Sequence, residues 1–279
     1  MQARAAAVRT VQSVMRSLAP TQIVLATDFS DVAADALRTA TLIADAFGAD
    51  LSVVFADDVE HPLALRHAET RLQRWIDARM PGRDVRPIVA AGPPVEALLA
   101  AADDVASDLI VFGAHHRHGL ERLYLGHFAE ELLHASPRPV LTVRRGMRVI
   151  HTIVCGVDCS DDARYALQSA VEWGDVFHAQ VNVVNVIEPE APRGHVVGEL
   201  ESWLPPELRA RCQTRELVIR GGVSERLVAY AGALKSDLII VGSGEMASVV
   251  RRARCAVLAM IEAPVFAELA PCDERHTRV

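Results

Sequence analysis

One stretch decides the fold of this chain: Ile23-Val24-Leu25-Ala26-Thr27-Asp28-Phe29-Ser30-Asp31, which returns as Ile153-Val154-Cys155-Gly156-Val157-Asp158-Cys159-Ser160-Asp161. A second block, Ser107-Asp108-Leu109-Ile110-Val111-Phe112-Gly113, returns as Ser236-Asp237-Leu238-Ile239-Ile240-Val241-Gly242. Both blocks recur in the same order, and their offsets along the chain differ by a single position. The chain therefore carries a duplicated domain and not a short solenoid repeat.

Each copy predicts strands that alternate with helices. In the first copy, the apolar run at residues 22–28 is typical of a buried parallel strand, and Ser30 is placed to cap a helix that ends at Gly48. Strands are expected at 51–56, 84–91, 109–112 and 140–143, and helices at 63–80, 93–105 and 127–135. This alternation predicts an α/β fold with two doubly wound, five-stranded parallel sheets in tandem, each Rossmann-like with strand order 3-2-1-4-5.

The repeat divides the 279 residues into four parts. We expect an N-terminal extension at 1–20, a first domain at 21–146, a second domain at 151–262 and a C-terminal tail at 263–279. The extension combines arginines with apolar residues at helical spacing. We expect a helix packed on the first domain or a frayed extension, and the alternative is a targeting peptide or a membrane-surface helix. The second domain also carries an insertion at about 188–210.

Composition argues against several classes of protein. A net charge of −7 disfavours broad contact with nucleic acid or a membrane surface, and no apolar run reaches the roughly 18–20 residues that cross a bilayer. The five cysteines form no Cys-x-x-Cys pair, which favours free thiols in the cytoplasm. The only lysine, Lys235, lies before a predicted strand, so a P-loop phosphotransferase is excluded.

The first domain contains a candidate anion site. In an open parallel sheet, ligands bind beyond the carboxyl ends of the strands where the strand order reverses, here between the strands that end at Asp28 and Gly113. The glycines at 113, 119 and 126 allow the backbone to approach a ligand closely. Gly126 then opens a helix, whose free N–H groups and positive dipole end favour an anion.

These features resemble the universal stress protein family. The resemblance covers almost all of residues 21–145 and, more weakly, 151–262, so the whole chain resembles the tandem-domain form of that family. It rests on these residues: Asp28-Phe29-Ser30, Ser107 to Gly113, His115, Arg117, Gly119-Leu120, Arg122 to Gly126, Ala129-Glu130 and Pro139 to Val143. It implies a stress-response or signalling protein that acts through ligand-dependent interactions and does not turn over a dedicated substrate.

Many members of the family bind ATP through a pattern of Gly, two residues, Gly, nine residues, Gly and then Ser or Thr. Gly113 and Gly126 match this pattern, whereas His116 replaces the second glycine and His127 replaces the hydroxyl residue. Loss of the hydroxyl removes a phosphate contact worth ~1 kcal/mol. The resemblance implies an adenine nucleotide such as ATP, with Mg²⁺ as an option, at the following residues: Ala26, Thr27, Asp28, Ala56, Gly113, His116, Gly119, Gly126, His127 and Phe128.

The second domain lacks most of this loop. Gly113 to Pro139 spans 26 positions, whereas Gly242 to Ala256 spans 14, so the second copy is shorter by twelve. The segment Gly242-Ser243-Gly244 remains, but no later Gly-Ser or Gly-Thr pair completes a site. We therefore expect no ATP site of the family type in this half.

Other functions stay open at this point. Four histidines of the first-domain loop are candidate ligands for zinc or another borderline metal: His115, His116, His118 and His127. The alternative is that they belong to a solvated polar loop without a metal. The alternatives to a nucleotide sensor are a nucleotide-free interaction module with both sites vestigial and a slow metal-assisted ATPase. The absence of a loop lysine and of a recognisable base weighs against efficient turnover.

The resemblance also implies how the two halves meet. Family members commonly pair through their last strands, so Val140–Val143 and Val257–Met260 are expected to form the edge between the two domains or between subunits. The two domains are expected to pack as an intramolecular pseudo-dimer. A homodimer is a further expectation.

Overall fold

The computed structural model describes residues 19–57, 62–114, 126–158, 160–187, 214–244 and 246–261. Several of the sequence predictions lie outside these residues: nearly all of the N-terminal extension, the insertion at 188–210, the C-terminal tail, and His115, His116, His118 and Gly119.

Strands and helices alternate along both halves of the chain. The first half comprises β1 (Gln22–Ala26), α2 (Asp31–Phe47), β2 (Asp50–Asp57), α3 (Pro62–Asp77), β3 (Arg86–Ala91), α4 (Pro94–Asp104), β4 (Leu109–Gly113), α5 (His127–Ala135) and β5 (Val140–Val143). The second half comprises β6 (Thr152–Val157), α6 (Asp161–Phe177), β7 (Gln180–Ile187), β8 (Thr214–Arg220), α9 (Val223–Leu234), β9 (Leu238–Val241), α10 (Met246–Arg252) and β10 (Ala256–Ala259).

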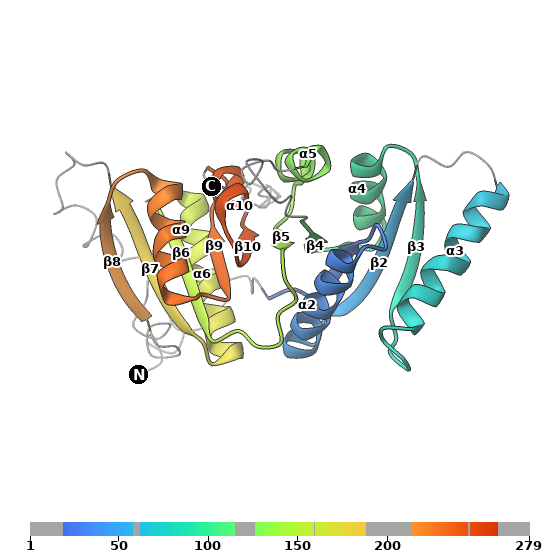
Figure 1. Ribbon diagram of the computed structural model, residues 1–279, viewed down its shortest axis with the longest axis horizontal. Coiled ribbons are helices and arrows are strands. Elements are labelled where there is room, and N and C mark those ends of the chain that lie inside the picture. Colours follow the sequence, from blue (N-terminus) through green and yellow to red (C-terminus); the bar gives the residue numbers. More distant parts are fainter. Residues whose placement is uncertain are drawn as a thin grey trace, which may run out of the picture.

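The strands form one ten-stranded sheet with the order β3-β2-β1-β4-β5-β10-β9-β6-β7-β8. Each half has the predicted order 3-2-1-4-5, and all its neighbouring strands are parallel. The halves join where β5 and β10 pair antiparallel, with Leu141 opposite Leu258. The pairing of the last strands, which the resemblance implied, is therefore observed within this chain, at the centre of the molecule in Figure 1.

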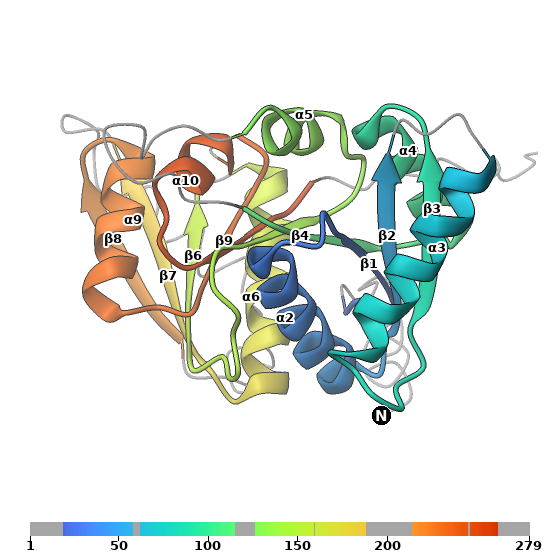
Figure 2. The ribbon, with the colours of Figure 1, turned by 45° about the vertical axis from the view of Figure 1, so that its right-hand side comes forward.

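Two layers of helices cover the sheet. Buried residues of α2, α3 and α6 form a core on one face, and those of α4, α5, α9 and α10 form a core on the other. Each core contains residues of both halves. Figures 1 and 2 show the helices that carry these residues. Trp173 of α6 is 1% exposed and packs against Phe47 of α2 with the ring centroids 5.4 Å apart, so an aromatic contact also joins the halves. No helix in the described parts of the chain is long and apolar enough to cross a membrane.

The repeated aspartates explain why the second sequence block recurs. Asp108, just before β4, accepts hydrogen bonds from the backbone N–H (2.7 Å) and the hydroxyl (2.6 Å) of Thr21 at the start of β1. Asp237, just before β9, accepts from the backbone N–H groups of His151 (2.8 Å) and Thr152 (3.0 Å) at the start of β6. Each aspartate thus ties two neighbouring parallel strands together in register.

Candidate ligand site

A cavity of about 460 Å³ lies at the carboxyl ends of β1, β2 and β4, where the strand order reverses. Ligand pockets typically measure ~300–1,000 Å³, so this cavity has the size of a small-molecule site. Seven of the ten residues that the sequence nominated line it: Ala26, Thr27, Asp28, Ala56, Gly113, Gly126 and Phe128. The structure therefore brings together residues from β1, β2, β4 and α5 that lie far apart in the chain.

The sequence pointed to Ala26 and Ala56 but not to the rest of the apolar wall, which includes Val54, Leu98 and Phe112. Ala26 at the end of β1 lies beside Val54 of β2 on one side and Phe112 of β4 on the other. Leu98 and Pro94 of α4 close the same wall. The predicted strand order already made β2 and β4 the neighbours of β1. The register, which decides which side chains of these strands lie beside Ala26, cannot be read from the sequence of a single strand.

The polar rim of the cavity is built by a tight turn after β1. The strand ends at Ala26, so Thr27 and Asp28 belong to the turn and not to the strand. The Thr27 hydroxyl accepts from the Phe29 N–H at 3.0 Å, and Asp28 Oδ1 accepts from the Ser30 N–H at 2.9 Å. Ser30 then caps α2 by accepting from the Ala33 N–H at 3.1 Å, as predicted. These bonds place the exposed Asp28 carboxylate at the mouth of the cavity.

Phe29 holds this turn in an unusual backbone conformation. Its φ is +67°, a region that costs a non-glycine residue about 1–3 kcal/mol and that is frequent at ligand sites. The Phe29 ring packs against Phe55, a cavity-lining residue, with the centroids 4.6 Å apart. The Arg71 guanidinium of α3 lies 3.9 Å from the centre of the Phe29 ring. These ring contacts offset the backbone strain and fix the turn against the β2 side of the cavity.

The opposite wall of the cavity is the beginning of α5. Gly126 is the N-cap of this helix and, having no side chain, makes no side-chain cap bond to its first N–H groups. Both Gly126 and Phe128 line the cavity, and Phe128 packs edge-on against Phe112 with the centroids 5.9 Å apart. The helix therefore begins at the cavity wall, where the partial positive charge of its amino terminus favours an anion.

Of the four candidate histidines, only His127 lies in the described residues. The His127 side chain is 92% exposed, points along α5 to within 3.6 Å of the Glu131 carboxylate, and is not among the residues that line the cavity. Only the backbone of His127 is therefore available to a ligand in the cavity. The other three candidate histidines lie outside the described residues, and within the described ones no group of three His, Cys, Asp or Glu side chains could hold a metal ion.

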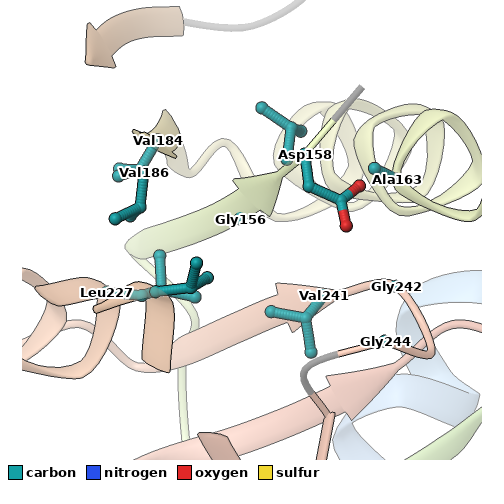
Figure 3. Close-up of a pocket in the computed structure, with 11 residues that line it drawn as sticks. Gly156, Asp158, Ala163, Val184, Val186, Leu227, Val241, Gly242 and Gly244 are labelled. Carbon is teal, nitrogen blue, oxygen red and sulfur yellow. The ribbon is translucent and has the colours of Figure 1, made fainter. Parts of the chain in front are cut away.

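In the described part of the second domain, only a vestige of this cavity is found at the matching place. At the corresponding place, a space of about 20 Å³ lies among Gly156, Val184 and Val241, the counterparts of Ala26, Val54 and Phe112 (Figure 3). Leu227 of α9 projects over β6: a Cβ built on Gly156 would come within 2.7 Å of the Leu227 Cδ2 atom. The space that the glycine opens is thus occupied by a leucine side chain.

The deletion in the second domain is visible in the structure. The α5 helix begins 14 positions after Gly113, whereas α10 begins four positions after Gly242. Val140 lies opposite Ile110 and Val257 lies opposite its counterpart Ile239, so Val140 and Val257 correspond. They lie 27 and 15 positions after Gly113 and Gly242, which gives the difference of twelve counted from the sequence. Asp158, the counterpart of Asp28, accepts hydrogen bonds from the N–H (3.1 Å) and the hydroxyl (2.5 Å) of Ser160 and so holds the turn before α6.

Comparison with known proteins agrees with this architecture. The profile of the universal stress protein family matches residues 20–144 and 150–260. A universal stress protein of Thermus aquaticus is 34% identical over 135 residues, which cover 44% of this chain and 97% of that protein. One from Methanocaldococcus jannaschii is 28% identical over 145 residues, which cover 44% of this chain and 82% of that protein.

The fold of the whole chain also has a solved counterpart. The crystal structure of a universal stress protein from Archaeoglobus fulgidus aligns with 88% of this chain and 99% of its own length at a TM-score of 0.69, with 16% sequence identity. At that identity the alignment speaks for the fold alone, and the family assignment rests on the two profile matches. The chain belongs to the universal stress protein family and carries two of its domains in tandem.

Proposed function

We propose that this chain is a stress-response or signalling protein that senses an adenine nucleotide, ATP foremost, through its first domain only. The observation that carries the proposal is the difference between the two matched sites: about 460 Å³ in the first domain and about 20 Å³ in the second. The second domain then serves as a structural or partner-binding half.

The cavity suits the parts of a nucleotide. Its apolar wall of Ala26, Val54 and Ala56 offers a surface for a purine ring, and Asp28 at the mouth offers a carboxylate to a ribose hydroxyl or to Mg²⁺. The start of α5, where the N-cap Gly126 makes no side-chain bond, offers N–H donors to phosphate oxygens. No arginine or lysine is among the described residues that line the cavity, so within this part of the site the helix terminus supplies the attraction for an anion.

Two further expectations stay proposals. We place the protein in the cytoplasm because its cysteines form no paired motif, and the two described cysteines, Cys155 and Cys255, are free. A homodimer is compatible with the fold but cannot use the strand edge through which the two halves already pair. Since β5 lies between β4 and β10, strand pairing between copies would have to use β3 or β8.

The proposal is tested by thermal unfolding in millimolar ATP, with and without Mg²⁺, together with mass spectrometry of any nucleotide that co-purifies. ATP at 100 times its Kd adds about 2.7 kcal/mol to the stability of the binding domain. A matched pair of variants locates the effect. Ala56→Leu fills the first cavity and should remove most of the stabilisation, whereas Val186→Leu, at the corresponding wall of the second domain, should retain it.

Each outcome has a distinct meaning. No stabilisation of the wild-type chain by ATP would contradict the sensor and favour a nucleotide-free interaction module. Equal loss in both variants would show that the nucleotide binds elsewhere. Multiple-turnover phosphate release that His127→Ala abolishes would instead favour a metal-assisted ATPase.

A further inference from the structure

Helix α10 of the second domain contacts α5, the helix that begins at the cavity of the first domain. Arg251 of α10 donates from Nη1 to Glu130 Oε1 of α5 at 3.0 Å. The two side chains are 35% and 39% exposed, so the ion pair is half-buried. Figures 1 and 2 show α10 and α5 together on the same face of the sheet, one from each half. This ion pair is a direct link between the halves.

A second contact between the halves holds α10 in place. Arg144, the residue after β5, donates to the carbonyl oxygen of Val250 and, at 3.5 Å, to that of Arg251. The preceding residue, Val143, accepts from the N–H of the cavity-lining Ala114 at 2.8 Å. The first domain thus positions the carboxyl end of α10, and α10 in turn presents Arg251 to α5.

Glu130 lies where an uncompensated negative charge would oppose an anionic ligand. It is the fourth residue of α5, and its N–H donates to the carbonyl of the N-cap Gly126 at 3.0 Å, so its carboxylate belongs to the first turn. A carboxylate there is favoured by the helix dipole, but it competes with any phosphate for the same positive end. An arginine paired with Glu130 removes that competition.

We propose that Arg251 of the second domain is a positioning residue for the first-domain site, which neutralises Glu130 and thereby strengthens the binding of anionic ligands at the start of α5. The degenerate half would then contribute to nucleotide affinity without binding a nucleotide itself. This inference rests on the proposed function of the first-domain cavity.

The test compares a charged and an uncharged ligand. Kd values for ATP and for adenosine are measured by calorimetry on the full chain, on Arg251→Met and on Arg252→Met, the exposed neighbour on α10 that serves as the matched control. Arg251→Met should weaken ATP binding roughly two- to fivefold, the size that single charges near a helix terminus produce, and leave adenosine binding within measurement error. Arg252→Met should change neither.

The partner variant completes a double-mutant cycle. Glu130→Gln should leave ATP affinity equal to wild type or higher, and Glu130→Gln combined with Arg251→Met should restore the affinity that Arg251→Met loses. Equal weakening of ATP and adenosine by Arg251→Met would indicate a purely structural role and overturn the inference. Unchanged ATP affinity in Arg251→Met would overturn it too, while leaving the cavity as a nucleotide site. Failure of the wild-type chain to bind ATP would overturn both proposals.

Discussion

The two motif glycines of the first domain should respond very differently to alanine. A Cβ on Gly113 would lie 2.7 Å from the carbonyl oxygen of Val32, 2.8 Å from its carbonyl carbon and 2.9 Å from its Cγ1. Around Gly126, by contrast, no heavy atom of the described residues lies within 4 Å of that position. Gly126 has φ −60° and ψ 152°, a conformation that alanine adopts without strain.

The expected magnitudes follow from these contacts. Ordinary carbon contacts are about 3.5–4.0 Å, so the Gly113→Ala methyl overlaps three atoms, two of them in the backbone of α2. Overpacking of this kind costs about 1–3 kcal/mol, and the upper end applies because backbone atoms cannot rotate away. Replacing glycine by alanine also lowers the conformational entropy of the unfolded chain, which stabilises the folded state by about 0.4–1 kcal/mol. Gly113→Ala should therefore destabilise the protein by about 2 kcal/mol, and Gly126→Ala, which changes only a helix cap, by less than about 1 kcal/mol.

The free energy of unfolding of Gly113→Ala and Gly126→Ala is measured by urea denaturation of the ligand-free chain, and their ATP affinity by titration of the same samples. Gly126→Ala should weaken ATP binding despite its near-normal stability, because Gly126 lines the cavity at the start of α5. Equal stability of Gly113→Ala and wild type would refute the steric reasoning at β4. A loss of stability in Gly126→Ala as large as that in Gly113→Ala would refute the claim that Gly126 serves the ligand and not the fold.

Two further predictions concern the second domain. Leu227→Ala removes a side chain that is 1% exposed and should cost about 2–4 kcal/mol in urea denaturation without creating ATP binding; a cost below about 1 kcal/mol would show that Leu227 does not fill the vestigial site. Burial raises the pKa of the Cys255 thiol from 9.0 to about 11. At pH 8.5 its thiolate population should therefore be on the order of a hundredfold lower in the folded than in the unfolded chain, and peptide mapping after iodoacetamide treatment should show slow folded-state labelling. The raised pKa also makes the free energy of unfolding depend on pH. Because the pKa of Cys255 is higher in the folded than in the unfolded chain, its contribution to stability is present below pH 9 and is lost between about pH 9 and pH 11. Rapid labelling of Cys255 at pH 8.5 without denaturant would contradict the burial.

Much of this fold could be predicted from the sequence because its signals are local. Apolar runs, helix caps and proline stops determine element bounds, and the predicted spans 127–135 and 140–143 coincide with α5 and β5. The alternation of strands and helices predicted the strand order, and the duplicated blocks showed that it applies to both halves. Helix α3 ends at Asp77, before the predicted end at 80.

The candidate site could be predicted only in part. Motif residues such as Gly113 and Gly126 are recognisable because their spacing is local, but the walls Val54 and Phe112 depend on strand register. In the second copy, glycine replaces Ala26, which alone would suggest a more open pocket. The pocket is nevertheless closed, because Leu227, from a helix much later in the chain, fills it. Tertiary contacts of this kind leave no local signal in the sequence.

The claim that only the first domain binds a nucleotide is tested most directly by the number of nucleotides bound per chain and by their position. Calorimetric titration with ATP, followed by a crystal structure of the complex, should show one nucleotide per chain, in the cavity between β1, β4 and the start of α5. Two nucleotides per chain, or one seated beside Gly156 and Leu227 in the second domain, would contradict the account.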